Sequence, residues 1–261
     1  MKVSVVKIGG NLIEDAADLE RALHNFAQIE GLKILVHGGG KLATQFAQKL
    51  GIETKMVDGR RVTDAQTLEI ITMVYGGLVG KTIVSKLQAK QCNAISLSGA
   101  DLNSIQSVKR PIKEHDFGFV GDISKVNAES FSTLLKAKIT PVCCAITHDA
   151  NGQLLNTNAD TIASEIAIAL SDEFEVSLYY CFEKKGVLRS IADENSVITD
   201  IDQASYAKLI EEGVIADGML PKLHNCFHAL ENKVHHVYVG SIAMLANPNE
   251  LKTTLRLNEF N

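Results

Sequence analysis

The sequence predicts an α/β protein of three layers, in which helices cover both faces of an open, mostly parallel central sheet. Two observations predict this class. Short apolar runs alternate with amphipathic segments along most of the chain, and glycines follow directly where the first two apolar runs end, at Gly9 and Gly38. Parallel strands would bring both glycine turns to one edge of the sheet, where ligands bind in open α/β sheets.

The first quarter of the chain is expected to form two strands, two helices and a hairpin. The strands are apolar runs, the helices repeat apolar residues every three to four positions, and the hairpin combines a central Asp-Gly pair with no helical period. The expected elements are a strand at 3–8, a helix at 15–29, a strand at 33–37, a helix at 41–50 and a hairpin over 52–64, with Arg60 and Arg61 just past its turn.

The alternation continues to the end of the chain, without an internal repeat. ITPVCCAIT, at 139–147, is a continuous apolar run of the kind found in a central parallel strand. SDEFE, at 171–175, is the expected boundary between two lobes, 1–172 and 173–261. The remaining expected strands lie at 93–99, 175–182 and 235–240, and a second hairpin is expected at 108–123. The remaining expected helices lie at 65–90, at 127–137, from the NTNAD segment to 169 and at 205–212, and a last helix is expected to end at about 232.

Composition limits the kinds of partner. The 261 residues can bury a sizeable core. A net charge of -5 argues against binding nucleic acid by general electrostatic attraction. Neither a signal sequence nor 18 uninterrupted apolar residues are found, and five cysteines without a CxxC spacing suit reduced thiols. We therefore expect a cytoplasmic protein with neither a membrane nor nucleic acid as partner.

Two glycine turns and a lysine predict a site for an anion. VKIGG places Lys7 at the end of an apolar strand, before Gly9 and Gly10. A buried ammonium group is costly unless an anion faces it, and adjacent glycines let the backbone approach a ligand closely. HGGGK repeats the arrangement after the second strand, with Gly38, Gly39 and Gly40. Backbone N–H groups at such turns can hold anionic oxygens.

Two further segments fit an anion site but leave alternatives open. In GMLPK, Pro221 suits the first position of a helix, which places Lys222 in the first turn, where the helix dipole disfavours a cation unless an anion is present. In NTNAD, Asp160 is either a helix N-cap or the partner of two lysines, and Asn156 could bind a ligand. Arg61 offers a fork for a carboxylate, although an arginine at a hairpin is usually solvated.

Two glycine-rich segments suggest other functions. GGLVGKT, at 76–82, lacks the spacing of a phosphate-binding loop and lies within a helical pattern, so we assign it to helix packing. GGGKLA, at 38–43, fits a dinucleotide-binding turn, with Asp58 at the distance expected of a ribose-binding acid. An oxidoreductase is therefore an alternative, although Asp58 falls in the predicted hairpin. No residue cluster predicts a metal ion held by the protein itself.

Taken together, VKIGG, HGGGK, GRRVTD, LSGAD, NxNAD and GMLPK resemble the amino acid kinase family over nearly the whole chain, and most closely its branch that acts on N-acylglutamates. The resemblance implies an acylglutamate-binding, dimerising first lobe and an ATP-binding second lobe. It implies phosphoryl transfer to the side-chain carboxylate of N-acetyl-L-glutamate or a related N-acyl-L-glutamate, in arginine biosynthesis, with Mg²⁺ bound mainly through ATP. The acyl group, acetyl or succinyl, stays open.

The resemblance also implies a role for each matching residue. Lys7 and Lys222 would stabilise the transition state and Asp160 would orient them. The acyl amino acid would be bound by Gly38, Gly39, Gly40, Arg61 and Asn156, whereas Gly9, Gly10, Glu183 and Gly186 would contact the phosphoryl group and the nucleotide.

The sequence departs from the family pattern at three places. Phe182 and Glu183 replace the usual Ser/Thr-Asp at the strand end that touches the nucleotide, and Gly80 replaces an asparagine before Lys81. The chain also starts on its first strand, so we expect a homodimer that arginine does not inhibit. The first departure makes a catalytically weak regulatory protein of the same fold an alternative function.

Overall fold

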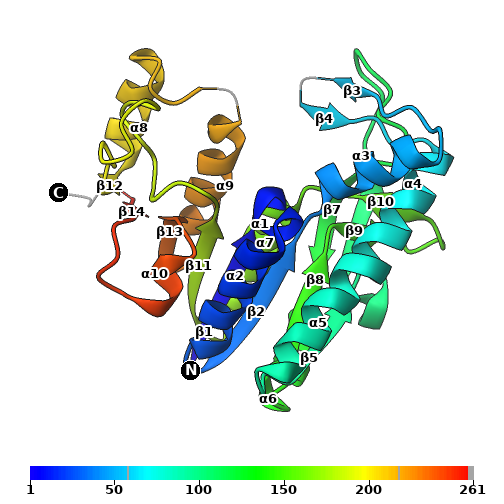
Figure 1. The fold of residues 1–261 in the computed structure, drawn as a ribbon, viewed down its shortest axis with the longest axis horizontal. Helices are drawn as coiled ribbons and strands as arrows, with labels where there is room; N and C mark the ends of the chain where they lie inside the picture. The colour runs from blue at the N-terminus through cyan, green and yellow to red at the C-terminus, as the bar shows by residue number, and fades with distance from the viewer. Residues whose placement is uncertain (58, 217, 258–261) are drawn as a thin grey trace.

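An eight-stranded sheet forms the middle layer of the computed structural model, which describes residues 1–57, 59–216 and 218–257 (Figure 1). All neighbouring strands are parallel except β13 and β14, which confirms the predicted fold class. The strands are, in spatial order, β12 (Asp200–Ile201), β14 (Thr253–Leu255), β13 (His236–Gly240), β11 (Glu175–Cys181), β1 (Lys2–Ile8), β2 (Leu32–His37), β8 (Thr140–Cys144) and β5 (Ala94–Leu97).

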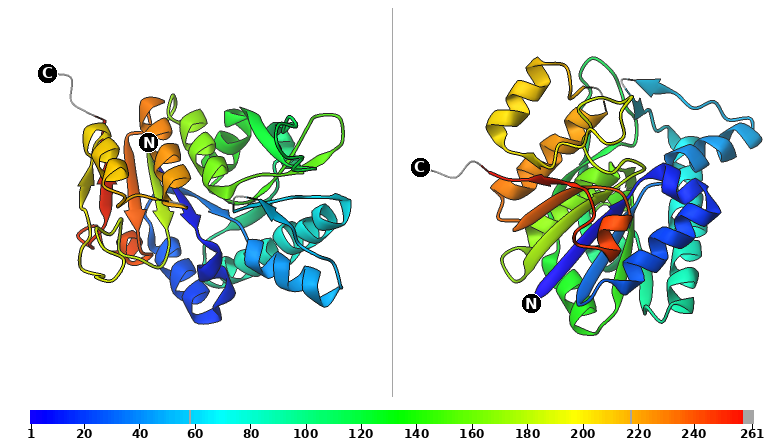
Figure 2. Two further views of the ribbon diagram at one scale, coloured as in Figure 1. Left: turned by 90° about the horizontal axis from the view of Figure 1, so that it is seen from above. Right: turned by 60° about the vertical axis from the view of Figure 1, so that its left-hand side comes forward.

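Helices cover both faces of this sheet, as the view from above shows (Figure 2, left). One layer contains α2 (Ala16–Gln28), α10 (Ala243–Ala246) and a long helix over residues 65–89. The other contains α6 (Ala128–Lys136), α7 (Ala159–Leu170) and α9 (Met219–Glu231). Three more helices lie at the ends of the strands or beside α9, namely α1 (Gly10–Glu14), α3 (Gly40–Lys49) and α8 (Gln203–Glu211).

Polar residues fix where several helices begin. The Asp15 side chain accepts hydrogen bonds from the amides of Ala17 and Asp18 at the start of α2, and Asp64 accepts one from the amide of Thr67. Such caps satisfy amides that have no partner inside the helix. The helices predicted at 15–29 and 41–50 begin and end within one residue of the predicted bounds, although only the first has a side-chain cap at its start.

The long helix consists of α4 (Ala65–Ile71), a π-helical segment η1 (Thr72–Val79) and α5 (Gly80–Ala89). GGLVGKT lies inside it, which confirms that this segment is not a phosphate-binding loop. A Cβ atom at Gly80 would lie 2.3 Å from the Ser96 Oγ, so glycine at this position allows the helix to approach β5. The helix is long and apolar enough to cross a membrane, but half of it is buried in the protein, as in the core helix of a globular protein.

A four-stranded sheet lies beside the main one, in the order β10 (Leu154–Asn156), β9 (Ile146–His148), β6 (Ile105–Lys109) and β7 (Gly121–Val126). The single strand predicted at 139–147 was wrong, because the chain leaves β8 of the large sheet at Ala145 and continues as β9 of this smaller one. Both halves are buried, so the apolar run does not reveal the change of sheet. A short 3-10 turn η2 (Asp101–Asn103) precedes β6.

The hairpin predicted over 52–64 is confirmed as β3 (Met56–Val57) paired with β4 (Arg60–Arg61), and it projects from the sheet (Figure 1). Asp58, on which the dinucleotide hypothesis depends, lies outside the described residues. The strand at 235–240 is not the last one, because the two- and three-residue strands β12 and β14 extend the sheet beyond it. These strands are too short to give a periodic signal.

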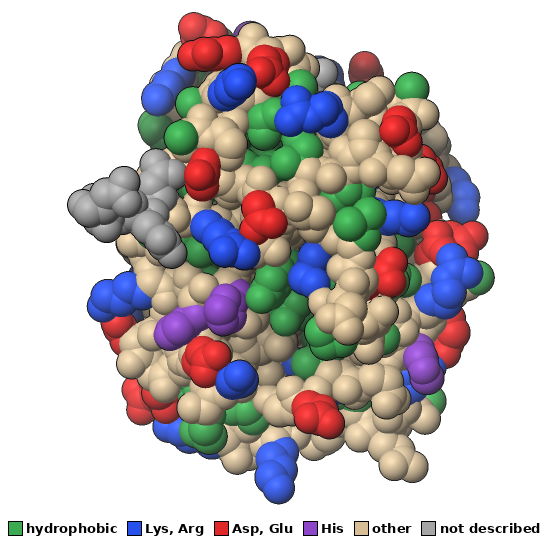
Figure 3. Space-filling model, turned by 90° about the vertical axis from the view of Figure 1, so that its left-hand side faces the viewer, with side chains coloured by type: hydrophobic (Ala, Val, Ile, Leu, Met, Phe, Trp, Pro, Cys, Tyr) green, Lys and Arg blue, Asp and Glu red, His purple; other side chains and the backbone are tan. Residues whose placement is uncertain are grey.

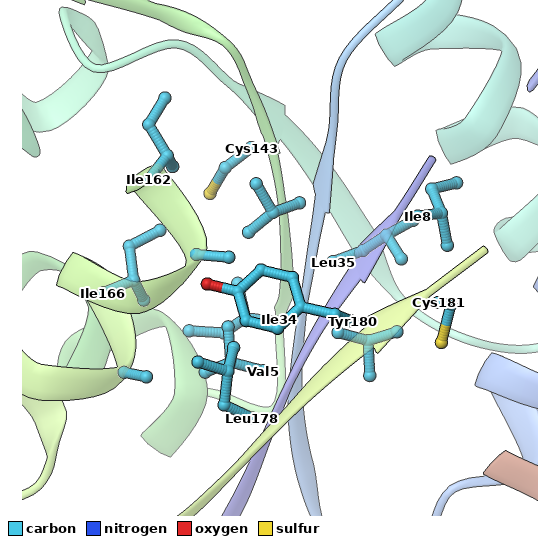
Figure 4. Packing of buried hydrophobic residues seen from close by; sticks show 14 of the residues in the cluster. Val5, Ile8, Ile34, Leu35, Cys143, Ile162, Ile166, Leu178, Tyr180 and Cys181 are labelled. Atoms are coloured by element: carbon cyan, nitrogen blue, oxygen red, sulfur yellow. The ribbon is translucent and has the colours of Figure 1, made fainter. Parts of the chain in front are cut away.

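Apolar side chains from β1, β2, β11 and α7 surround Tyr180, which is fully buried. In Figure 4 its ring lies among Val5, Ile34 and Leu178, and its hydroxyl points toward α7. This hydroxyl donates a hydrogen bond of 2.9 Å to the carbonyl of Asp160, in the first turn of α7. The core therefore fixes the N-terminal end of α7 relative to the sheet.

The division into lobes at 172/173 stays a prediction. The turn after α7 lies at this boundary, and β11, which follows, pairs with β1 along seven residues, so that one sheet crosses it. On the side of the protein that carries α8 and β12, acidic and basic side chains are interspersed among neutral ones (Figure 3).

Candidate active site

Lys7, Asp160 and Lys222 form an ion-paired cluster at the carboxyl ends of the central strands. The Lys7 Nζ lies 2.7 Å from Asp160 Oδ1, and the Lys222 Nζ lies 2.9 Å from Asp160 Oδ2. The three side chains are 13%, 17% and 14% exposed. Residues from β1, α7 and α9 thus meet at one carboxylate, and each of the three side chains keeps a small exposed fraction.

The two ammonium groups keep Asp160 ionised. Burial by itself raises the pKa of this carboxyl, but the charges of Lys7 and Lys222 and their hydrogen bonds outweigh burial and lower the pKa from 3.8 to about 2. At neutral pH the cluster therefore contains one negative charge between two positive ones. The net positive charge favours binding of an anion.

The local structure explains why Asp160 is available to both lysines. Asn158, rather than Asp160, caps α7: its Oδ1 accepts hydrogen bonds from the amides of Asp160 at 2.7 Å and Thr161 at 3.3 Å. The N-cap alternative for Asp160 was therefore wrong. The aspartate lies in the first turn of α7, where the helix dipole also stabilises a carboxylate.

Lys222 lies at the start of α9. The prediction that Pro221 takes the first helical position was wrong, because α9 begins at Met219 and Pro221 is its third residue. Proline is still tolerated there, since the first amides of a helix have no partner within it. The Lys222 ammonium also lies 5.5 Å from the centre of the Tyr180 ring, so the buried tyrosine positions both Asp160 and Lys222.

The glycine turn after β2 is held in an unusual conformation. Gly39 has a φ of 146°, and a Cβ atom there would lie 3.1 Å from the Tyr75 ring. The carbonyl of Gly40 accepts a hydrogen bond of 2.7 Å from Arg61, which also donates to the Thr44 Oγ1 at 2.8 Å. Arg61 is thus attached to the glycine turn instead of being fully solvated.

Gly39→Ala is expected to lower the free energy of unfolding by about 1–3 kcal/mol, because a side chain is strained at this φ and would displace Tyr75. Urea unfolding measures the change. Gly51→Ala, with a φ of 71° but open space around its Cβ, is the matched control and is expected to have a smaller effect. Equal effects of the two substitutions would show that the Tyr75 contact contributes nothing.

Asn156 and Arg61 are brought to the same region through Thr63. The Asn156 Nδ2 donates a hydrogen bond of 3.0 Å to the Thr63 Oγ1, two residues beyond Arg61. A Cβ atom on Gly38 would lie 3.9 Å from the Cβ of Ala159, next to Asp160. The structure therefore brings the glycine turn, Arg61 and Asn156 to the same end of the sheet as the lysine pair.

The first glycine turn differs from its prediction in one respect. The amide of Gly9 donates a 3.0 Å hydrogen bond to the carbonyl of Cys181, so it is not an exposed donor at this turn. Gly10 begins α1, and its position has open space where a side chain would lie. Of the two glycines, only Gly10 fits the expected role of an exposed amide.

Sequence reasoning missed Lys41 and Asn11, which join the two glycine turns. The Lys41 ammonium donates a hydrogen bond to the Asn11 Oδ1. Lys41 is the second residue of α3, and the argument applied to Lys222, a cation in the first turn of a helix, would have singled it out as well.

The residues expected at the nucleotide lie beyond β11. Glu183 is exposed, whereas Phe182 is half-buried and its amide donates to the carbonyl of Gly240 at 3.0 Å. Gly186 is buried: a Cβ atom there would lie 2.6 Å from Val197 and 2.7 Å from Thr253. Glycine at 186 is thus required by packing, and the nucleotide contacts of Glu183 and Gly186 stay predictions.

The side chains of the described residues include no group of three His, Cys, Asp or Glu that could hold a metal ion. The five cysteines are all buried and unpaired with one another. Within these described parts of the chain, the polar centre of the site consists of lysines, one aspartate, an arginine, two asparagines and backbone amides, a set that suits a phosphorylated or carboxylated ligand.

The fold and this cationic site are those of a kinase that transfers a phosphoryl group. Residues 2–241 match the model of the amino acid kinase family, and the chain belongs to that family. It is 53% identical to acetylglutamate kinase of Bacteroides thetaiotaomicron over 249 residues, which cover 95% of this chain and 96% of that one. It is 52% identical to acetylglutamate kinase of Cytophaga hutchinsonii over 253 residues, with 95% and 96% covered.

Two solved structures share the fold. N-acetylglutamate synthase from Neisseria gonorrhoeae, complexed with coenzyme A and N-acetyl-glutamate, gives a TM-score of 0.82 at 20% identity and covers 99% of this chain and 60% of that one. Carbamate kinase from Giardia lamblia bound to AMP-PNP gives a TM-score of 0.74 at 14% identity and covers 98% of this chain and 99% of that one.

Protonation of the Asp160 carboxylate at low pH is expected to lower the free energy of unfolding. Because its pKa is lowered on folding, its contribution to stability is present in full only well above 3.8, the pKa of the carboxyl in the unfolded chain, and is lost as the pH falls through about 2. We expect the difference in unfolding free energy between wild type and Asp160→Asn to be constant above about pH 5 and to shrink below pH 4. Urea unfolding across this range measures it. A difference independent of pH down to 2 would contradict the assigned pKa.

Proposed function

We propose that this protein transfers the γ-phosphoryl group of ATP to the side-chain carboxylate of N-acetyl-L-glutamate, in arginine biosynthesis. The observation that carries the proposal is the cluster in which Asp160 holds Lys7 and Lys222 at 2.7 and 2.9 Å. Acetylglutamate kinases more than 50% identical over 95% of the chain support the choice of substrate. The activity is that of a phosphotransferase with a carboxyl group as acceptor.

The reaction needs no general base. A side-chain carboxylate with a pKa near ~4.3 is ionised at neutral pH and can attack directly. One of its oxygens forms a bond to the γ-phosphorus, the bond from this phosphorus to the oxygen bridging to the β-phosphate breaks, and that electron pair leaves with ADP. The products are ADP and an acyl phosphate.

The main barrier is electrostatic, because an anionic nucleophile must approach an anionic phosphate. In the proposed arrangement Lys7 lies on the side of the attacking carboxylate and Lys222 on the side of the leaving ADP. Each lysine uses one bond to Asp160, which leaves further N–H groups for the transferring phosphoryl oxygens. Asp160 orients both ammonium groups and takes no proton.

The acylglutamate is proposed to bind at the turn Gly38 to Gly40, with Arg61 and Asn156. These residues lie at the same end of the sheet as the lysines, and Arg61 already contacts the Gly40 carbonyl. The remaining N–H groups of its guanidinium suit a carboxylate of the substrate. Gly10, at the start of α1, is proposed to face the transferring phosphoryl group.

Mg²⁺ is proposed to enter with ATP. The donors gathered around Asp160 are ammonium groups, which cannot ligate a cation, so the metal would be held by phosphate oxygens and water. When bound, it would neutralise charge on the nucleotide. The lysines would neutralise the charge that develops on the migrating group.

A homodimer in the cytoplasm is proposed as the form in solution. Met73 and Leu78, both on η1, are 58% and 46% exposed and offer an apolar surface on one helix. Size-exclusion chromatography with light scattering is expected to give twice the chain mass of 28.3 kDa. A monomer mass at micromolar concentration would contradict the dimer.

Hydroxylamine trapping tests the activity. With ATP, Mg²⁺ and N-acetyl-L-glutamate, the acyl phosphate is expected to yield a hydroxamate in step with ADP formation. Binding of both ligands without hydroxamate would favour the regulatory alternative, and binding of NAD alone would favour an oxidoreductase. Repeating the assay with N-succinyl-L-glutamate decides the acyl group, and a higher kcat/KM for the succinyl compound would overturn the choice of acetyl.

A further inference from the structure

His37 is the last residue of β2 and directly precedes the glycine turn. Its side chain is completely buried, and its Nδ1 lies 2.8 Å from the carbonyl oxygen of Gly38. A carbonyl oxygen only accepts hydrogen bonds, so Nδ1 must carry the proton. Burial lowers the pKa of the imidazole to about 4, against a weaker opposite effect of the Gly38 bond, so the ring is neutral at pH 7. The proton therefore sits on Nδ1 and Nε2 carries none.

The bond from His37 fixes the orientation of the next peptide group. The described residues contain no cis peptide, and in a trans peptide the C=O and the N–H point in opposite directions. Because the Gly38 carbonyl points at the buried imidazole, the Gly39 amide points away from it. The amides of Gly38, Gly39 and Gly40 donate to no backbone carbonyl among the described residues.

A run of three glycines does not hold one conformation by itself, because glycine loses more conformational freedom on folding than any other residue. Side chains restrain this turn at two carbonyls: Arg61 and Thr44 donate to the Gly40 carbonyl, and His37 donates to the Gly38 carbonyl. The Tyr75 ring also packs against Gly39. Of these restraints, the His37 bond is the one made to the peptide group that carries the Gly39 amide.

We propose that His37 is a positioning residue for the acyl amino acid. The Nδ1–H group of His37 holds the Gly38–Gly39 peptide group so that the Gly39 amide donates a hydrogen bond to an oxygen of the substrate. The proposal rests on the proposed function, which assigns this turn to the acylglutamate. His37 touches no substrate and exchanges no proton. Its Nε2 has no hydrogen-bond partner among the described residues and plays no part.

Two nearly isosteric variants separate the hydrogen bond from packing. In His37→Asn the side-chain N–H takes the place of Nδ1–H, whereas His37→Leu keeps a similar shape without a donor. We expect His37→Leu to raise the KM for N-acetyl-L-glutamate about tenfold and the KM for ATP less than twofold. His37→Asn should stay within threefold of wild type for both. Thermal unfolding of the two variants shows whether either one fails to fold.

Equal changes in the KM for N-acetyl-L-glutamate in both variants, or none in either, would overturn the proposal. Should a variant not fold, amide NMR of the wild type tests the contact that His37 is proposed to position: adding N-acetyl-L-glutamate should shift the Gly39 amide proton downfield, and an unchanged signal at saturation would overturn the proposal. If wild type forms no hydroxamate, the function has failed. If it forms hydroxamate but the variants behave alike, only the role of His37 has failed.

Discussion

Lys222→Ala is expected to lower kcat by about 10²–10³-fold, because removing one preformed charge donor from a transition state has this effect in other enzymes. The KM for N-acetyl-L-glutamate should change less than threefold, since the substrate is bound mainly at the glycine turn, Arg61 and Asn156. A loss in kcat alone identifies an interaction made only in the transition state. Hydroxamate formation at varied substrate concentration measures both constants.

Lys233→Ala is the matched control for this substitution. Lys233 lies just beyond the end of the same helix, is 75% exposed and pairs with Asp172 at 2.8 Å. Its removal should leave kcat and KM unchanged. If Lys222→Ala weakened substrate binding as much as turnover, the ammonium group would serve the bound substrate and not the transition state.

Asp160→Ala is expected to lower the free energy of unfolding by about 3–5 kcal/mol, because it leaves two mostly buried ammonium groups without a partner. Turnover should fall as well, since neither lysine is then oriented. Urea unfolding measures the stability, and circular dichroism in the absence of urea confirms that the variant is folded.

Asp172→Ala provides the comparison for a surface ion pair. Asp172 is 80% exposed and pairs only with the exposed Lys233 among the described contacts, so its loss should change stability by less than about 1 kcal/mol. An Asp160→Ala protein as stable as Asp172→Ala would show that the cluster gains nothing from the buried carboxylate.

The fold class could be predicted from the sequence because each layer has a different period. Strands buried on both faces give continuous apolar runs, and helices lying on them give amphipathic ones. The same signal fails where the environment stays apolar but the topology changes, as at Ala145, where the chain passes from one sheet to the other. It also fails for β12 and β14, which are shorter than a recognisable pattern.

The lysine cluster could be anticipated because each lysine stands where a cation is electrostatically unfavourable without an anion. The choice between the two roles of Asp160 could not, since asparagine and aspartate both cap helices and only coordinates show that Asn158 does so. The bond between the Gly9 amide and Cys181 joins residues 172 positions apart in the chain and leaves no local signal. Such contacts decide which amides face a ligand.

The central claim is that the ammonium groups of Lys7 and Lys222 act on the same migrating phosphoryl group. A crystal structure with ADP, Mg²⁺, aluminium fluoride and N-acetyl-L-glutamate tests this most directly, because aluminium fluoride stands in for the transferring PO₃ unit. Both Nζ atoms should lie within about 3 Å of its fluorine atoms while keeping their bonds to Asp160. A complex in which either lysine points away from the aluminium fluoride would contradict the claim.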